Sequence, residues 1–341
     1  MKKILWSALL LFLVGLSAPK GQAQVPGPLK LVQTIPLPGL KDGDFDHFGV
    51  DAAGQRLFVG AEENSLVPVI DLRTNKVIGK FVGAKAPHSM GYNPETKKLY
   101  VADDGGPNQV EIFDSTSYKL LGTIPMDAHA DVSIYDPGTQ LFYVGNGGRQ
   151  AKEEYTLISV VDTKADKKVG DIKIDGDRIE SIRIEEKGPR MFVNVYYKGM
   201  VAVVDRTKQS VITTWDFSRE GKNFGSMAID EADHRLFVHA RDPGKVLVID
   251  TESGKLITSL LCQGDYDDAI WDTATRRLYL IGAPFLKVWQ KSAEGDRYDI
   301  IGQVPTGFHS LTGILVGNRL FIAVNHHGTT DAVVQAYEVV P

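Results

Sequence analysis

Acidic residues and histidines recur at matching points of this 341-residue chain, in combinations that could bind a metal or a polar ligand. The chain repeats a short strand, and each copy can be aligned on its last residue. Five residues before that end stand Asp46, His88, Asp131, Glu180, Gly225, Asp267 and Leu311. Seven residues before it stand Asp44, Ala86, His129, Arg178, Asn223, Asp265 and His309. Positions two apart point the same way in an extended strand, so we expect one polar belt.

The chemistry of this belt is that of a metal or polar small-molecule site. The candidate ligand-binding residues are Asp46, His88, His129, Asp131, Glu180, Asp267 and His309. The candidate metal ligands among them are His88, His129, Asp131 and His309. Imidazole with carboxylate suits zinc, copper, nickel or iron, whereas carboxylate with water suits calcium. A divalent metal ion is therefore a candidate cofactor, and a hydrated polar channel without a ligand is the competing interpretation.

The remaining histidines are assigned by their place in the repeat. His47 lies one position away from the belt and is expected to face its own blade. His234 falls in a turn and His239 near the end of a strand, so both are expected to be structural. His326 and His327 lie in a loop on the same side as the belt.

The elements that must position the belt are short strands separated by turns. A basic or amide residue followed by alternating apolar residues occurs seven times, beginning at Arg56, Lys98, Gln140, Arg190, Arg235, Arg277 and Arg319. Period-2 alternation with aromatic and β-branched residues predicts strands, and Gly, Pro, Asn and Asp mark the turns. Five of the next strands end in Asp, at Asp71, Asp114, Asp162, Asp205 and Asp250, where the side chain can cap a turn.

The spacing of the copies, about 40 to 50 residues, is typical of propeller blades. The sequence therefore predicts an all-β fold, a seven-bladed β-propeller of four-stranded blades. The seventh copy stops at Pro341 without a fourth strand. The segment 29–36 resembles the fourth strand of the second copy, 119–125, so the N-terminal strand is expected to complete the last blade. Such closure removes an open sheet edge.

The first residues read as a targeting segment rather than as part of the fold. Two lysines precede an apolar run from Ile4 to Leu16, and small residues at Gly21 and Ala23 suit cleavage. This pattern predicts a signal peptide at 1–23, with a single propeller domain at 24–341. The run is short for a membrane span, and no later segment is long and apolar enough. A periplasmic or secreted protein without a membrane span is expected.

Composition and motifs exclude several classes of function. A net charge of −5 without a basic run disfavours nucleic acid as a partner. The single cysteine, Cys262, cannot form an internal disulfide or a thiolate metal cluster. Asp42-Gly-Asp44-Phe-Asp46 begins like a calcium loop but lacks its later glycine and glutamate. Phosphate-loop, dinucleotide, C-x-x-C-H haem and G-x-S-x-G motifs are absent from the sequence.

The repeated unit resembles the YVTN repeat family, also called YncE-like propellers. The likeness is clearest in Lys98-Leu-Tyr-Val-Ala102, Val246-Leu-Val-Ile-Asp250 and Lys255-Leu-Ile-Thr-Ser-Leu260. The resemblance implies an exported propeller, in a family mostly without an assigned reaction. It transfers no catalytic residue to this chain, and the DNA binding reported for some members fits poorly with the acidic balance.

Three functions remain open at this point. The first is an exported binding or scaffold propeller, expected to be a monomer, with a protein or small molecule at the channel mouth. The second is a metal-dependent hydrolase, lactonase or lyase, in which the metal activates water or polarises a carbonyl and a His or Glu moves the proton. The third is a redox propeller with a haem-like cofactor. Metal content separates the first two, and a visible absorption band would support the third.

Overall fold

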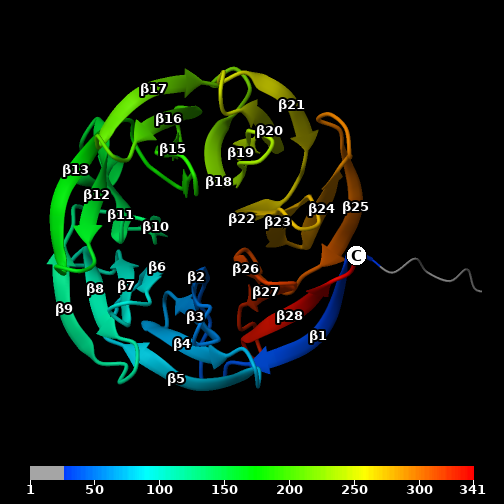
Figure 1. The fold of residues 1–341 in the computed structure, drawn as a ribbon. Helices are drawn as coiled ribbons and strands as arrows, with labels where there is room; N and C mark the ends of the chain where they lie inside the picture. The colour runs from blue at the N-terminus through cyan, green and yellow to red at the C-terminus, as the bar shows by residue number, and fades with distance from the viewer. Residues whose placement is uncertain (1–26) are drawn as a thin grey trace, which may run out of the picture.

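The computed structural model describes residues 27–341, which form seven four-stranded antiparallel sheets arranged in a ring around a central axis (Figure 1). The all-β, seven-bladed prediction is confirmed. The predicted signal peptide at 1–23 lies outside the described residues. None of the described segments forms a helix with the length and apolarity that a membrane crossing requires.

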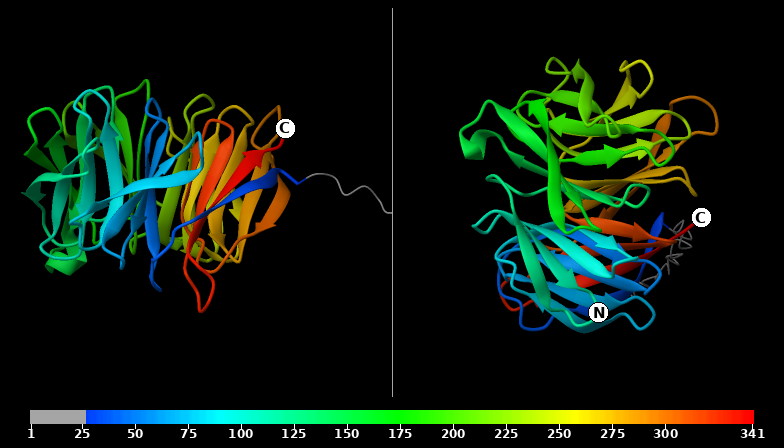
Figure 2. Two further views of the ribbon diagram at one scale, coloured as in Figure 1. Left: turned by 90° about the horizontal axis from the view of Figure 1, so that it is seen from below. Right: turned by 60° about the vertical axis from the view of Figure 1, so that its left-hand side comes forward.

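The four strands of each blade lie side by side, with the first strand at the axis and the fourth at the outer rim (Figures 1 and 2). The innermost strands are β2 (Phe45–Asp51), β6 (Pro87–Asn93), β10 (Ser133–Asp136), β14 (Ile182–Ile184), β18 (Lys222–Asp230), β22 (Asp265–Asp272) and β26 (Gly313–Val316). The second strands are β3 (Arg56–Ala61), β7 (Lys98–Asp103), β11 (Leu141–Gly147), β15 (Arg190–Val195), β19 (Arg235–Asp242), β23 (Arg277–Ala283) and β27 (Arg319–Val324). These second strands coincide with the seven repeats read from the sequence.

The third strand of each blade is largely buried, and the fourth strand is the most exposed. The third strands are β4 (Leu66–Asp71), β8 (Gln109–Asp114), β12 (Tyr155–Asp162), β16 (Met200–Asp205), β20 (Lys245–Asp250), β24 (Phe285–Lys291) and β28 (Val333–Val339). The fourth strands are β5 (Lys76–Val82), β9 (Leu120–Pro125), β13 (Lys167–Asp175), β17 (Ser210–Asp216), β21 (Leu256–Leu261), β25 (Tyr298–Pro305) and β1 (Leu29–Pro36). The Asp that ends a third strand accepts turn N–H groups as predicted, for example from Arg73 and Thr74 at Asp71.

The N-terminal strand closes the ring. Strand β1 pairs antiparallel with β28, from Leu29 opposite Val339 to Pro36 opposite Val333. Ile35 is 1% exposed and belongs to the apolar cluster between the last and first blades. The first strand of the chain thus supplies the fourth strand of the last blade, as predicted from its likeness to 119–125.

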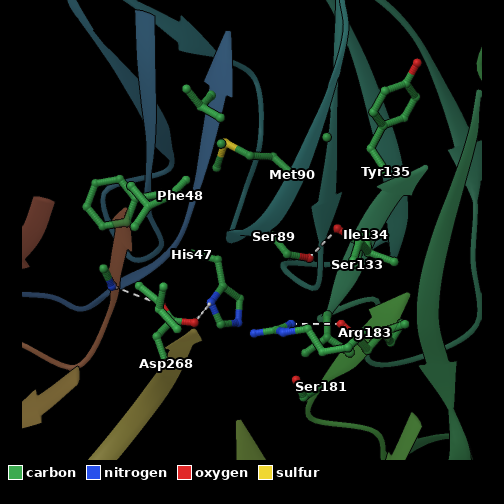
Figure 3. A pocket seen from close by; sticks show the side chains of 18 of the residues that line it. His47, Phe48, Ser89, Met90, Ser133, Ile134, Tyr135, Ser181, Arg183 and Asp268 are labelled. Carbon is green, nitrogen blue, oxygen red and sulfur yellow. Dashed lines mark hydrogen bonds and ion pairs between the residues drawn. The ribbon is translucent and has the colours of Figure 1, made fainter. Parts of the chain in front are cut away.

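Apolar packing lies between blades rather than at the axis. Seven clusters of buried side chains each join two neighbouring sheets, such as Phe58 and Val69 of one blade with Met90 and Phe113 of the next. Burying these side chains stabilises the ring by roughly 1.5 to 3 kcal/mol for each large one. The axis itself remains open, with a cavity of about 490 Å³ lined by innermost strands (Figure 3).

Candidate functional site

The predicted belt lines a second cavity, of about 410 Å³, at one mouth of the channel. Its wall carries six carboxylates, three imidazoles and two guanidinium groups. These side chains are Asp46, Glu62, Asp104, Asp131, Glu180 and Asp267, then His47, His88 and His129, then Arg178 and Arg241. We call this cavity the acidic pocket. Six of the seven candidate ligand-binding residues line it, so strands and loops far apart in sequence converge as expected.

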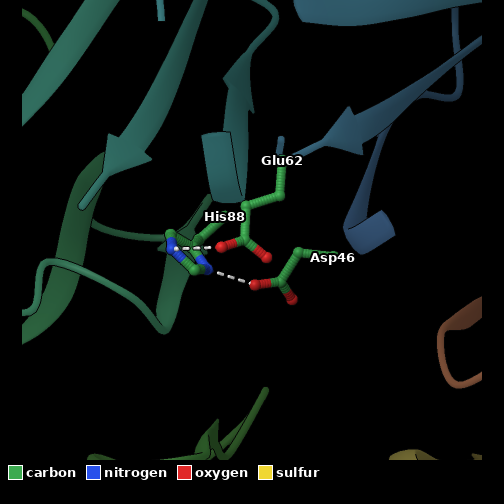
Figure 4. Close-up of side chains that lie close together, drawn as sticks. All are labelled: Asp46, Glu62 and His88. Carbon is green, nitrogen blue, oxygen red and sulfur yellow. Dashed lines mark hydrogen bonds and ion pairs between the residues drawn. The ribbon is translucent and has the colours of Figure 1, made fainter. Parts of the chain in front are cut away.

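One cluster in the acidic pocket joins Asp46, Glu62 and His88 (Figure 4). His88, on β6, directs Nδ1 to Asp46 of β2, and its Nε2 lies 3.7 Å from Oε1 of Glu62. The same Nδ1 is 3.4 Å from Oδ1 of Asp131. One ligand atom from each member of the cluster lies within 4.8 Å of the others, which is a separation that a single cation could bridge.

A second cluster joins His129, Asp131 and Glu180. The Nε2 of His129 lies 3.2 Å from Asp131, and its Nδ1 lies 3.2 Å from Asp104. Its backbone has a φ of 64°, in the left-handed region, and the amide N–H is held by the side-chain oxygens of Asp104 and Asn108. The local turn therefore presents the imidazole to the pocket from a conformation other than an extended strand.

In the second cluster, an arginine side chain already supplies the positive charge that a metal ion would bring. Arg178 pairs with Glu180 and lies 3.6 Å from Asp131. Across the pocket, Arg241 pairs with Asp267. The cluster of Asp46, Glu62 and His88 has no such arginine contact among the ion pairs of residues 27–341, so it is the better candidate for a metal ion.

Charge coupling sets the protonation of the first cluster. Burial on its own would lower the pKa of His88, but the hydrogen bond to Asp46 and the charges of Asp46 and Asp131 raise this pKa to about 10. Burial also opposes ionisation of Asp46, yet attraction to His47 and the hydrogen bond from His88 hold the pKa of this carboxyl well below its usual range. Asp46 and His88 therefore form an ion pair at neutral pH.

Other carboxyls in the pocket hold protons more tightly than usual. Burial raises the pKa of Glu62 to about 7, with His88 opposing the rise and Asp46 adding to it. Burial and neighbouring charge raise the pKa of Glu180 to about 7. The pKa of Asp267 rises to about 6, again chiefly through burial. The arginines and imidazolium groups thus leave part of the carboxylate repulsion unrelieved.

The prediction that His47 faces its blade is wrong. Its ring lies in the channel, with Nε2 at 3.3 Å from Asp46 and Nδ1 at 3.2 Å from Asp268 (Figure 3). The pairing of β2 with β3 has a register irregularity between Phe45 and Phe48, which aims successive side chains to the axis. A matching irregularity between Tyr266 and Asp268 brings Asp268 to the channel, a residue that strict alternation missed.

His309 lies apart from the other candidate residues. Its side chain is 49% exposed, and its Nδ1 lies 3.1 Å from Asp44 outside the acidic pocket. Its backbone φ of 45° shows that this segment also departs from an extended strand. His239, expected to be structural, is 1% exposed, and burial lowers its pKa to about 3.

The insertion in the third blade contributes one further wall residue. A 3-10 helix, η1 (Gly148–Ala151), carries Gln150 to the acidic pocket. Gly148 has a φ of 69°, and a Cβ there would lie 2.3 Å from the carbonyl oxygen of Asp177. Glycine is therefore required for the insertion to pack against the next blade. The length of the insertion was visible in the sequence, but its direction was not.

The donor set fits a borderline divalent cation. One imidazole and two carboxylates offer nitrogen and oxygen ligands of the kind that zinc, manganese or iron accept. Both ring nitrogens of His88 now face carboxylates, so binding a metal there requires loss of a proton from a group whose pKa is about 10. Metal affinity at this cluster should therefore rise with pH.

Comparison with known proteins identifies the architecture only. No protein-family model matches the chain, and no curated protein matches it in sequence. A chain of the mitotic checkpoint complex is 14% identical with a TM-score of 0.76, covering 98% of this chain and 99% of that chain. Hydrazine synthase from Kuenenia stuttgartiensis is 16% identical with a TM-score of 0.67, covering 85% and 96%. At these identities the likeness shows the fold alone.

Proposed function

We propose that this chain is an exported, YncE-like β-propeller that acts as a binding protein, with its ligand site in the acidic pocket. The gathering of six carboxylates around two arginines carries this proposal. Such a wall attracts cations, and a bound cation would offset the burial and the carboxylate repulsion that raise the pKa of Glu62. The repeat motifs and the N-terminal Lys2 to Ala23 pattern support the family likeness and export to the periplasm or medium.

Within this pocket, we assign a divalent metal ion to Asp46, Glu62 and His88. Protein purified without a His tag or chelator should contain metal by elemental analysis or should bind one of zinc, copper, nickel, manganese or calcium. A ligand at about 100 times its dissociation constant stabilises the native state by about 2.7 kcal/mol. For a chain of this size that corresponds to a rise in melting temperature of roughly 5 °C.

Two variants and one matched control test the assignment. Glu62→Gln and His88→Ala should fold and lose most of the metal-induced rise. His234→Ala removes an exposed imidazole on a turn, paired with Glu252, and should keep the rise. If wild-type protein contains no metal and none of the five ions moves its melting temperature, the metal assignment is wrong.

A metal-dependent hydrolase, lactonase or lyase is the second candidate. It is favoured by the pKa of about 7 at Glu180, which lies outside the proposed metal ligands and suits a general acid or base at neutral pH. A metal at the neighbouring cluster would lower the pKa of a bound water or polarise a carbonyl. Turnover of esters or lactones that requires metal and is abolished in Glu180→Gln, with metal still bound, would support this activity.

A further inference from the structure

The channel beneath the acidic pocket has a different chemistry. Its cavity of about 490 Å³ is lined by β2, β6, β10, β14, β22 and β26. His47, Glu180 and Asp267 belong to the walls of both cavities, so the two cavities adjoin. A ligand long enough to pass these shared side chains would contact both.

One residue in this channel stands out from its equivalents in the other blades. Arg183 lies on β14, two positions before Glu185, the residue on which the repeats are aligned. The matching positions of the other six blades carry only glycine or apolar residues: Gly49, Gly91, Ile134, Ala228, Ile270 and Ile314. A long cationic side chain is thus placed at the axis where the repeat itself does not require one.

The guanidinium of Arg183 has few partners. It donates to the carbonyl oxygens of Ile182, at 2.8 Å, and Ala269, at 3.5 Å. Within the described part of the chain it forms no ion pair, and burial lowers its pKa, opposed only by the charge of Asp268. By contrast, the arginines of the acidic pocket, Arg178 and Arg241, each pair with a carboxylate.

Asp268 is not available to neutralise Arg183. Its carboxylate accepts hydrogen bonds from the hydroxyl of Thr312, at 2.7 Å, and the N–H of Gly313, at 3.0 Å. It also lies 3.2 Å from Nδ1 of His47. In Figure 3 the guanidinium of Arg183 points across the channel towards the His47 ring, which is itself engaged with carboxylates. None of the nearest carboxylates therefore pairs with Arg183, and an anionic group of a ligand could bind beside its guanidinium.

Two hydroxyl groups flank the same space. Ser181 lies two positions before Arg183, directly ahead of β14, and its Oγ accepts the N–H of Met227 at 3.1 Å. The hydroxyl of Ser133, from the neighbouring blade, donates to Oγ of Ser89 at 2.6 Å, because the single proton of Ser89 is given to the carbonyl oxygen of Asp131. In the hydrogen bonds of residues 27–341 the Ser181 hydroxyl only accepts, so it can donate a hydrogen bond to a ligand, whereas Ser133 must turn away from Ser89 to do so. Both line the cavity beside Arg183 (Figure 3).

We propose that the axial channel binds the carboxylate of a small ligand through Arg183 and Ser181. A guanidinium presents parallel N–H donors that match a carboxylate, and charge-assisted bonds of this kind are the stronger ones. A carboxylate carries one charge, which Arg183 alone can neutralise. A phosphate carries more charge, and six carboxylates at the mouth repel it. Resting on the function proposed for the acidic pocket, the ligand of the whole axis is then a zwitterion, with its cationic end at the mouth.

Calorimetry with defined probes tests this inference at fixed pH and ionic strength. The probes are acetate, methylammonium, phosphate and 4-aminobutyrate, a zwitterion that carries both groups. We expect 4-aminobutyrate to bind at least about tenfold more tightly than acetate or methylammonium, as one further charged hydrogen-bonded contact implies. Arg183→Gln should weaken acetate and 4-aminobutyrate by about tenfold or more. Arg297→Gln removes an exposed arginine that pairs with Asp299 and should change neither.

Melting of the ligand-free protein separates a binding arginine from a structural one. Arg183→Met removes a buried cation without a carboxylate partner, so the variant should melt at or above the wild-type temperature. Melting well below wild type, or carboxylate binding by Arg183→Gln equal to wild type, would overturn the proposal. Phosphate binding more tightly than any carboxylate would overturn the ligand class. If Arg183→Gln loses acetate binding while the wild-type protein responds to neither metal nor methylammonium, the channel site is supported. The function proposed for the acidic pocket is then contradicted.

Discussion

The ion pair at the channel mouth makes a quantitative prediction for Asp46→Asn. The pKa of His88 rises from 6.5 to about 10, which at about 1.4 kcal/mol per unit corresponds to roughly 5 kcal/mol of favourable coupling. Asp46 shares this coupling with Asp131 and Glu62. Replacing Asp46 by Asn also removes the free-energy cost of burying the Asp46 carboxylate. We therefore expect Asp46→Asn to lower the unfolding free energy by a net amount of about 2 kcal/mol at pH 6. The His88 side chain is only 12% exposed, so solvent screens the pair weakly.

The raised pKa of His88 also predicts how the effect of Asp46→Asn on stability should change with pH. A group whose pKa is raised on folding contributes stability that is complete below its unfolded pKa and is lost as pH rises through the folded value. The difference between wild type and Asp46→Asn should therefore be largest near pH 6 and should shrink towards pH 10. At acidic pH, Asp46 stays ionised until well below the usual carboxyl range, because its pKa is lowered in the folded protein. Its contribution to stability therefore persists until that pH.

Urea denaturation at pH 6, 8 and 10 measures this difference, and NMR titration of the histidine rings measures the pKa of His88 directly. Asp44→Asn is the matched control, because Asp44 pairs with the half-exposed His309 and should cost less than about 1 kcal/mol. A wild-type His88 that titrates near 6.5, or a stability difference that is constant from pH 6 to 10, would refute the reasoning.

Three further predictions concern export, closure and a buried acid. Exported protein should begin near Gln24 by N-terminal sequencing, and mature protein that retains Met1 would contradict the signal peptide. Deletion of 29–36 exposes the edge of β28 and should lower the melting temperature sharply, whereas a deletion that melts like the parent would mean that β1 is dispensable. Burial and a hydrogen bond to Asp103 raise the pKa of Glu111 to about 9, so wild-type stability should fall as pH rises from about 4.5 through 9. Glu111→Gln should flatten that part of the pH profile in denaturant titrations, and an unchanged slope would count against a protonated Glu111.

The fold could be predicted from the sequence because the same strand pattern occurs seven times along the chain. The second strands repeat a short run of apolar and aromatic residues that fits a buried strand, and their spacing sets the number of blades. Closure by 29–36 followed from comparing one fourth strand with another. None of these inferences depended on a single residue, so local irregularities could not overturn them.

The candidate site was predictable only where its strands are regular. Asp46, His88 and Asp131 fall at one register and do meet in the acidic pocket. Strict alternation failed at His47 because an irregularity in β2 turns successive side chains towards the axis. It failed at His309 because a left-handed backbone precedes β26. Arg183 could have been found by aligning the position two before each strand end, where it is the one charged residue.

The distribution of apolar packing explains how this axis can hold so many charges. Each blade buries its large side chains against its neighbours, as Phe192 and Val201 do with Phe224 and Leu247. The innermost strands therefore need not fill the centre, and the channel can hold water or ligand instead of a packed core. Carboxylates that repel one another at the mouth, and an arginine without an acidic partner below them, cost free energy that the ring of apolar clusters offsets. Substitution of an axial residue without an acidic partner, such as Arg183, should consequently alter ligand binding more than folding, whereas breaking the pair of Asp46 and His88 should also cost stability.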